Sequence, residues 1–288
     1  MIIIDYSGLA MGSMLSQDKN APIDETVTRN LILNTLRGYN VKYKAKYGKM
    51  VIACDGGSWR RDIFPEYKAN RRKNREEGVA THDWEEIFRI MGVIREEIEE
   101  YLPYKVVKIG NVEADDIIAI LVETTQEFGN YEDVMIVSAD KDFIQLQKYG
   151  NVKQYSPMTK KMIEDKNPHK YLFEHILRGD SSDGVPNVLS PDDVFTSGGR
   201  QTSLRSTKID EWYQTPDNLQ SVMPAEIYTN YLRNKKMIDL SCIPEDIKES
   251  IVTTYNSVPE TPNSKVFSYL VKKRCSNMLV SCANEFFS

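Results

Sequence analysis

Eight carboxylate side chains are placed where they can act together on a metal ion and a phosphate group. Seven of them follow short apolar segments with the pattern of buried strands, and the eighth lies later, in GDSSDGVP (179–186). In chain order they are Asp5, Asp55, Glu113, Asp115, Asp116, Asp140, Asp142 and Asp183. Sites in open parallel sheets form beyond the carboxyl ends of the strands. The first seven acids are therefore expected to converge on one rim if these strands are neighbours.

A carboxylate cluster of this kind needs a counter-charge. Converging carboxylates repel one another, which raises their pKa values and destabilises the fold when no cation is present. Magnesium or manganese suits an all-carboxylate, partly hydrated site. Two such ions about 3.5–4 Å apart can activate water and stabilise the oxygen that leaves phosphorus. The pattern therefore predicts metal-dependent chemistry on phosphate esters.

Each acid taken alone has a simpler interpretation. A single Asp after a strand is usually a turn residue or a helix N-cap, whereas four such placements on four strands favour a metal site. Asp116 is the weakest member, because two adjacent helical residues, Asp115 and Asp116, cannot both closely face the same ion.

The elements that must position these acids alternate between strand and helix patterns. Strand patterns at 2–5, 50–55, 104–110 and 133–140 are separated by helix patterns, of which 82–103 is strongly amphipathic. A further strand at 151–157 is expected at an edge of the sheet. This order predicts an α/β fold, with a mostly parallel central sheet flanked by helices on both faces.

The second half of the chain has a different character. After about residue 157 the strand patterns fade, and helix patterns alternate with polar stretches, including an irregular connection near 190–207. We therefore predict an α/β core at 1–157 and a mainly helical half at 158–288.

A basic segment lies between the second strand pattern and the amphipathic helix. It contains seven basic residues and two acidic ones, which are Arg60, Arg61, Lys68, Arg71, Arg72, Lys73 and Arg75 against Asp62 and Glu66. Carboxylates repel a phosphate backbone, so these cations are expected to attract it, arginine with two hydrogen bonds. Tyr67 is expected to stack on an unpaired base or to pack beside it. A solvated charged helix face is the simpler alternative.

Composition narrows the class of protein. The 288 residues are 41% hydrophobic, which is enough for a large core, and the net charge of −5 is segregated along the chain and so does not exclude nucleic acid. The four cysteines form no CxxC pair and, with three histidines, give no zinc spacing, so reduced thiols are expected. No apolar run reaches the roughly 20 residues that cross a bilayer. We expect a protein of the cytoplasm that does not bind membranes.

Four segments in combination resemble the 5′ nucleases of the flap endonuclease family, which includes the 5′-nuclease domain of bacterial DNA polymerase I. They are FPEYKANR (64–71), EADD (113–116), SADKDFIQL (138–146) and RGDSSDGVPNV (178–188). The segments at 151–161, 238–247, 251–257 and 265–272 resemble the ribonucleases H of T-even-type bacteriophages within that family. The resemblance spans essentially the whole chain.

The resemblance implies roles for the acids. The first of two Mg²⁺ ions, for which Mn²⁺ could substitute, would be served by Asp5, Asp55, Glu113, Asp115 and Asp140, and the second by Asp142 and Asp183. Asp115 and Asp140 would be catalytic, and Asp116 would hold a hydrated metal or a group beside it. The histidines His82, His169 and His175 are expected at the surface or in packing.

The resemblance also implies how nucleic acid is held. Residues 58–82 would form an arch that orders around single-stranded 5′ ends and is mobile without substrate, and Lys68 and Arg71 would approach the scissile phosphate. The helical half would bind duplex DNA through a helix-hairpin-helix-like element. The family's glycine-rich continuation is replaced here by residues 187–207, which puts a potassium site in doubt. The residues expected to bind nucleic acid are Arg60, Arg61, Tyr67, Lys68, Arg71, Arg72, Lys73, Gly184 and Lys208.

The expected function is that of a metal-dependent 5′-to-3′ exonuclease and flap endonuclease with ribonuclease H activity. It would hydrolyse phosphodiesters near the 5′ ends of RNA/DNA or DNA/DNA duplexes and so remove primers and flaps in DNA replication. The family implies a single-stranded DNA-binding protein and a sliding clamp as partners, and we expect a monomer. The terminal NEFF (284–287) is either a docking peptide or a packed end.

Two alternatives remain open from the sequence. A PIN-type ribonuclease shares a similar acidic rim, but is usually shorter and lacks both FPEYKANRR (64–72) and GDSSDGVP. An inactive, structure-specific DNA-binding replication factor would need the basic segment but not the complete set of acids.

Overall fold

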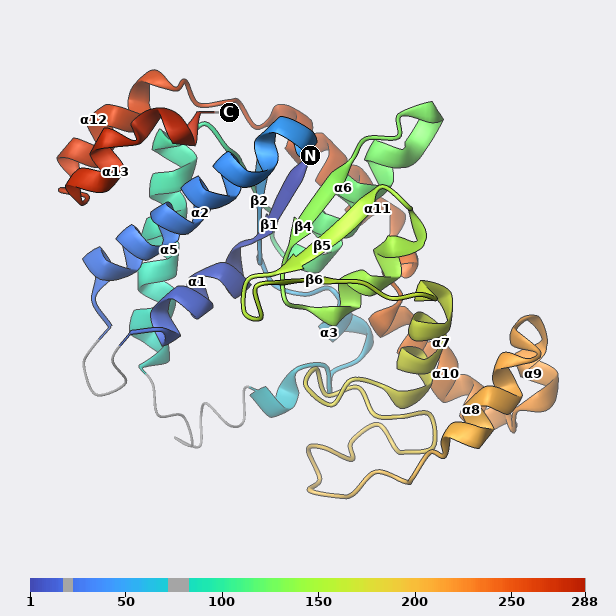
Figure 1. Ribbon diagram of the computed structural model, residues 1–288. Helices are drawn as coiled ribbons and strands as arrows, with labels where there is room; N and C mark the ends of the chain where they lie inside the picture. Colours follow the sequence, from blue (N-terminus) through green and yellow to red (C-terminus); the bar gives the residue numbers. More distant parts are fainter. Residues whose placement is uncertain (18–22, 72–82, 288) are drawn as a thin grey trace.

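A six-stranded sheet forms the centre of the computed structural model, which describes residues 1–17, 23–71 and 83–287 (Figure 1). The strands lie in the order β3-β2-β1-β4-β5-β6. They are β1 (Ile2–Asp5), β2 (Met50–Cys54), β3 (Lys105–Lys108), β4 (Val134–Val137), β5 (Val152–Ser156) and β6 (Lys161–Ile163). Neighbouring strands from β3 to β5 are parallel, and β6 is antiparallel to β5. The predicted α/β fold with a mostly parallel sheet is confirmed.

One detail of the predicted sheet is wrong. The strand expected at an edge, β5, lies between β4 and β6, and the edge is the three-residue β6. No apolar pattern indicates β6 in the sequence, because its three residues are mostly exposed.

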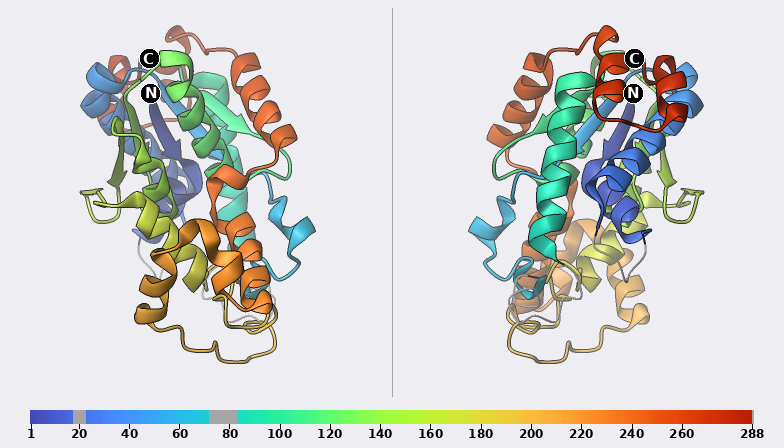
Figure 2. Two further views of the ribbon diagram at one scale, coloured as in Figure 1. Left: turned by 90° about the vertical axis from the view of Figure 1, so that its right-hand side faces the viewer. Right: turned by 90° about the vertical axis from the view of Figure 1, so that its left-hand side faces the viewer.

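Helices cover both faces of the sheet because its central strands are apolar on both sides (Figure 2). In β1, Ile2 and Ile4 point to one face and Ile3 to the other, and all three are fully buried. The first face carries α1 (Tyr6–Leu15), α2 (Glu25–Tyr47), α5 (Trp84–Tyr101), α12 (Ser264–Lys272) and α13 (Asn277–Ser281). The second carries α6 (Ala114–Gln126), η2 (Lys141–Lys148) and α11 (Glu245–Ser257).

A helical lobe lies next to the carboxyl ends of the strands (Figure 1). It consists of α7 (Pro168–Arg178), α8 (Ser206–Tyr213), α9 (Leu219–Val222) and α10 (Ala225–Ile238), around a small core that contains the buried Trp212. Other short helices that the structure describes include α3 (Arg60–Ile63), η1 (Glu127–Gly129), η3 (Pro216–Asn218), η4 (Leu240–Cys242) and η5 (Ala283–Phe286).

The helices after the lobe return to the sheet. Ile251 of α11 is buried in the core of one face, and Tyr269 of α12 in the core of the other. We therefore propose a lobe of residues 168–238, in place of one separate half at 158–288. Among the residues that the structure describes, no helix is both long enough and apolar enough to span a bilayer.

Candidate active site

The strand order places the predicted acids along one rim. Because β3, β2, β1 and β4 are consecutive neighbours, the acids that follow them share the carboxyl edge of the sheet. Asp5 ends β1 and caps α1, where its Oδ1 accepts a hydrogen bond from the Gly8 amide at 3.1 Å. Ser138, after β4, donates to Asp5 Oδ2 at 2.9 Å.

Asp55 is held between two other segments of the rim. The Ser7 hydroxyl donates to its Oδ2 at 2.5 Å, and the Ala114 amide at the start of α6 donates to its Oδ1 at 2.9 Å. The next residue, Gly56, lets the ends of β2 and β3 meet, since a Cβ there would lie 1.8 Å from the Ile109 carbonyl oxygen. Only glycine allows this close approach.

The turn after β4 presents Asp140 and Asp142. The Asp142 amide donates to Asp140 Oδ1 at 2.9 Å, so that Asp140 caps η2. The side-chain amide of the buried Gln154 of β5 donates from Nε2 to the carbonyl oxygens of Ser138 at 3.1 Å and Asp140 at 2.5 Å. These bonds fix the backbone that carries both carboxylates.

Burial and neighbouring charges raise the pKa values of several carboxylates of the rim. Burial raises the pKa of Asp5, and burial together with the Asp140 charge raises that of Asp115 further. Desolvation in the cleft and the Asp142 charge raise the pKa of Asp140 to about 6. The pKa of Asp183 is also raised, by burial first, although Lys68 and Arg71 lower it in part. An excess of negative charge therefore lies along the rim, and the oxygen donors that carry it suit hard divalent cations.

Lys68 supplies part of the missing positive charge. Its ammonium group contacts Glu113 Oε1 at 2.5 Å and Asp183 Oδ2 at 3.4 Å. The backbone is held in the left-handed region at φ 55°, and its N–H donates to the Asp183 carbonyl at 2.7 Å. Such a conformation is costly outside glycine and is typical of functional positions.

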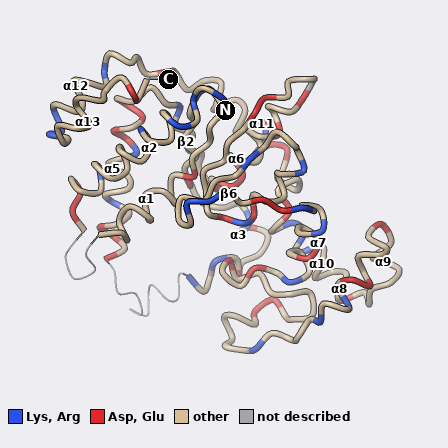
Figure 3. The backbone as a smooth tube through the Cα atoms, in the orientation of Figure 1, with Lys and Arg blue, Asp and Glu red and all other residues tan. Residues whose placement is uncertain are grey.

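The segment before residue 72 is joined to the turn that follows α7. Arg71 forms an ion pair with Asp183 and donates to the Ser182 carbonyl at 2.9 Å. Figure 3 shows the basic residues of this segment beside the acidic residues of that turn. Gly184, at φ +76°, lies against the segment, and a Cβ there would be 2.8 Å from the Glu66 carbonyl oxygen. The predicted hairpin glycine therefore contacts protein, not an open surface.

Two predicted members of the site have structural roles. Arg60 is only 2% exposed and binds Asp116 Oδ1 at 2.8 Å, Glu113 Oε2 at 2.7 Å and the Met237 carbonyl at 2.8 Å. Asp116 is fully buried and also accepts from the Trp59 indole at 3.0 Å. Contact with nucleic acid by Arg60 and metal binding by Asp116 therefore do not agree with the structure. A buried charge needs a buried partner, and these two neutralise each other.

Two further expectations also change. Tyr67 is 4% exposed and its hydroxyl donates to Asp183 Oδ2 at 2.9 Å, so it packs under the site and does not offer a ring for stacking. Glu113 is 4% exposed, with its oxygens bound by Lys68, Arg60 and Ser58. Although burial opposes ionisation, Lys68 and Arg60 lower the pKa of Glu113. It is an anchor for cations at the border of the rim.

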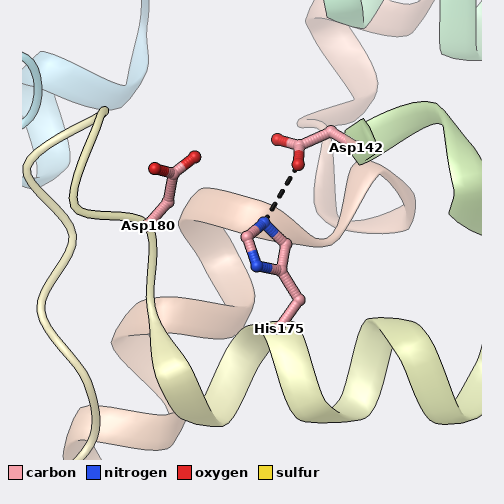
Figure 4. Close-up of side chains that lie close together, drawn as sticks. All are labelled: Asp142, His175 and Asp180. Carbon is pink, nitrogen blue, oxygen red and sulfur yellow. Dashed lines mark hydrogen bonds and ion pairs between the residues drawn. The ribbon is translucent and has the colours of Figure 1, made fainter. Parts of the chain in front are cut away.

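A group at the end of the rim was not predicted from the sequence. His175 Nε2 lies 2.9 Å from Asp142 Oδ1, and Asp180 is close to both (Figure 4). His175 was expected at the surface or in packing. Its position five residues before Asp180 on the same helix and turn was the available signal.

A cleft of about 990 Å³ runs along these residues. Its acidic wall contains Asp5, Asp140, Asp142 and Asp180, and its other wall comes from α1, α2 and the turn between β5 and β6. The predicted cations that the structure describes do not line it: Lys68 and Arg71 are bound to carboxylates, Arg61 is exposed, and Lys208 pairs with Glu211 at 3.1 Å on α8. Arg72, Lys73 and His82, with most of the predicted arch, fall outside the described residues.

Comparison with known proteins finds two family matches that together span most of the chain. Residues 3–173 match the family described as "5'-3' exonuclease, N-terminal resolvase-like domain", and residues 168–286 match "T4 RNase H, C terminal". The ribonuclease H of Enterobacteria phage T4 is 37% identical over 99% of this chain and 95% of its own length. A 5'-3' exonuclease of Buchnera aphidicola is 33% identical over 52% of this chain and 50% of its own.

Solved structures share the fold. A phage T5 flap endonuclease in complex with DNA and metal ions has a TM-score of 0.67 at 18% identity, over 89% of this chain and 98% of its own. A T5 5'-exonuclease with bound zinc has a TM-score of 0.61 at 18% identity, over 90% of this chain and 98% of its own.

Proposed function

Because the chain belongs to the 5′-3′ exonuclease family, we propose that it hydrolyses phosphodiesters near the 5′ ends of RNA/DNA and DNA/DNA duplexes, with magnesium as its cofactor. It is a nuclease of the 5′-to-3′ exonuclease and flap endonuclease type. Removal of primers and flaps during DNA replication is the use that this chemistry supports. The proposal rests on one observation: the rim carries more carboxylates than cations, and Lys68 and Arg71 lie at its border.

Neither alternative interpretation is favoured. The two family matches reach from residue 3 to 286 and include FPEYKANRR and GDSSDGVP, which a PIN-type ribonuclease is expected to lack. An inactive DNA-binding factor would not need Asp5, Asp55, Asp115, Asp140 and Asp142 on one rim.

We propose that the acids present hold two divalent ions, which their oxygen donors suit by chemical type. Asp5, Asp55, Asp115 and Asp140 would hold the first, and Asp142 and Asp183, with Asp180, the second. Burial first, and neighbouring charges second, raise the pKa values of Asp5, Asp115, Asp140 and Asp183, and a bound cation would favour their ionised forms. Bound magnesium supplies Lewis acidity and activates water for attack on phosphorus, and manganese is expected to substitute for it.

The protein's own cations would position the substrate. Lys68 and Arg71 are bound to Asp183, in the same turn as Asp180 and Ser181, which line the cleft. Exchange of a carboxylate for a phosphate oxygen would place their charge where negative charge grows during cleavage. Glu113 would keep the Lys68 ammonium directed toward the cleft.

DNA is the proposed substrate partner. The related T5 fold was solved with DNA, and in this chain Arg61, Arg71 and Lys208 remain accessible enough to contact phosphates. We predict a single-stranded DNA-binding protein and a sliding clamp as partners. The monomeric state and a place in the host-cell cytoplasm also stay predictions.

The test is cleavage of a 5′-labelled flap duplex, and of an RNA primer on DNA, with Mg²⁺ and with EDTA. Wild-type protein should cut both substrates near the 5′ end only with the metal. Asp142→Asn should cut at least about 100-fold more slowly, because loss of a ligand weakens the metal site. Asp246→Asn, at an exposed position on α11, should cut normally. Full activity of Asp142→Asn would refute the metal site, and binding of flaps without cleavage would favour the inactive factor.

A further inference from the structure

His175 is a nitrogen donor directed at the acidic rim. Its Nε2 lies 2.9 Å from Asp142 Oδ1, and one donor atom each from Asp142, His175 and Asp180 all lie within 4.8 Å of one another. Figure 4 shows the ring rising from α7 between the two carboxylates. The three side chains therefore form a compact mixed group of one nitrogen and two oxygen donors.

Two packed elements and one turn hold this group in place. Asp142 belongs to η2 and His175 to α7, which pack against each other, and Asp180 follows α7 directly. The ring of Tyr171, one helical turn before, lies 5.9 Å from the His175 ring and restricts its rotation. Asp180 is oriented by amide donors from Ser182 at 2.7 Å and Asp183 at 3.3 Å.

The spacing of the donor atoms fits one divalent ion. Bonds of about 2.1 Å in an octahedron put adjacent ligand atoms roughly 3.0 Å apart and opposite ones roughly 4.2 Å apart. The distance of 2.9 Å between His175 Nε2 and Asp142 Oδ1 matches an adjacent pair of ligands. The donor atoms of all three residues lie within 4.8 Å of one another, so only a small movement would bring them to octahedral distances. The group also forms part of the wall of the cleft that contains Asp5 and Asp140, so an ion there would lie on the substrate side.

We propose that His175 is a ligand of the second divalent ion, and that this nitrogen makes the second site favour manganese over magnesium. The inference rests on the proposed function, because it assigns one more ligand to the same centre. Magnesium strongly prefers oxygen, whereas manganese and the later transition metals accept imidazole. Asp5, Asp55, Asp115 and Asp140 offer only oxygen, so the two sites should differ in their preference between the metals.

A simpler role for His175 is to orient Asp142 by a hydrogen bond without touching the ion. The two roles differ in whether a nitrogen atom is bonded to the metal. Pulsed electron paramagnetic resonance of Mn²⁺ on the full-length protein measures this, because a directly bonded nitrogen couples to the manganese electron spin.

The experiment compares wild type, His175→Gln and His169→Gln. His169 is exposed and lies on the same helix, so it controls for the loss of a histidine from α7. We expect nitrogen coupling in wild type and His169→Gln and none in His175→Gln. Mn²⁺ affinity should fall about tenfold or more in His175→Gln, and Mg²⁺ affinity less.

The outcomes separate the inference from the proposed function. Mn²⁺ that binds wild type without nitrogen coupling would overturn the ligand role of His175 and leave the carboxylate centre intact. Wild type that binds neither metal would overturn both. If His175→Gln does not fold, wild-type protein labelled with histidine that contains the isotope nitrogen-15 provides the test. A histidine ligand must change the nitrogen coupling pattern on labelling, and an unchanged pattern would refute the ligand role of His175.

Discussion

Asp115 and Asp116 are adjacent in sequence but have opposite electrostatic environments. Burial first, and then the charges of Asp140 and Asp5, raise the pKa of Asp115, whereas Asp116 is paired with the buried guanidinium of Arg60. The helix turns by about 100° between them, so Asp115 stays partly exposed and Asp116 is fully buried in the interior. The same acidic motif therefore provides one ligand and one structural anchor.

We expect Asp116→Asn and Asp115→Asn to separate these roles. Asp116→Asn leaves Arg60 partly unpaired in the core and should lower the free energy of unfolding by about 3 kcal/mol. Asp115→Asn removes a repelling charge, so without metal its stability should equal or exceed that of wild type while cleavage is lost. Urea unfolding in EDTA and the flap assay measure both. A stable Asp116→Asn protein with weakened metal binding would return Asp116 to the metal site.

The rim also predicts a dependence of stability on pH. Folding raises the pKa of Asp140 from 3.8 to about 6, so the native state binds this proton more tightly. Without metal, the stability that the protonated group contributes is present below 3.8 and is lost as pH rises through about 6. The stability of Asp140→Asn relative to wild type should therefore increase between about pH 5 and about pH 7.5 in EDTA. Urea unfolding at both values tests this, and a difference that is constant with pH would contradict it.

Sequence alone predicted the rim but not the partners inside it. The acids follow strands that are recognisable locally, and parallel strands bring their ends together by geometry. Burial of Arg60 depends on Met237, which lies far away in the sequence, and the contact of His175 with Asp142 depends on how α7 packs on η2. The segment 60–75 contains seven basic and two acidic residues, and this composition alone could not show which cation would be buried.

The turn after α7 is the element that couples the lobe to the basic segment. Asp183 and Gly184 contact residues 66–71 through backbone and side chain. The sequence predicted a hairpin at this turn. The predicted irregular connection follows it, and the chain forms no helix or strand between α7 and α8. The side of the hairpin that faces Lys68 is fixed by tertiary packing and has no local signal.

Gly184→Ala tests this coupling. Its Cβ would lie 2.8 Å from the Glu66 carbonyl oxygen, so the segment that carries Lys68 must shift. Gly198→Ala is the matched control, because it has nearly the same positive φ, +77°, and no atom within 4 Å. Both should lose about 1 kcal/mol from backbone strain. Under conditions in which both variants are fully folded, only Gly184→Ala should slow cleavage in the flap assay. Equal cleavage rates of the two variants would refute the coupling.

The C-terminal segment is joined to α2 on one face of the sheet. Asn40 of α2 donates to the carbonyl oxygens of Glu285 at 2.8 Å and Phe287 at 2.9 Å, and Phe286 is fully buried in that core. In the segment NEFF the structure therefore shows a packed end at Phe286. The returning helices make the sheet core depend on residues after the lobe.

Phe286→Ala should lower the free energy of unfolding by about 3–5 kcal/mol, because it leaves a cavity in the core of that face. Phe287→Ala, at a partly exposed position, should cost less than about 1 kcal/mol. Urea unfolding of the two variants with wild type measures the difference. Equal stability of all three proteins would show that NEFF is not part of the core.

The strand order has one more consequence. From β1 the chain winds outward through β2 to β3, and then β4 returns to the other side of β1, so the direction of winding reverses between β1 and β4. The segments that leave these two strands, α1 and η2, go to opposite faces of the sheet and open a crevice between them. The cleft thus results from chain topology, and its side chains can be exchanged without a change of fold. A histidine among the aspartates is such an exchange, and it would retune the metal preference while the scaffold stays the same.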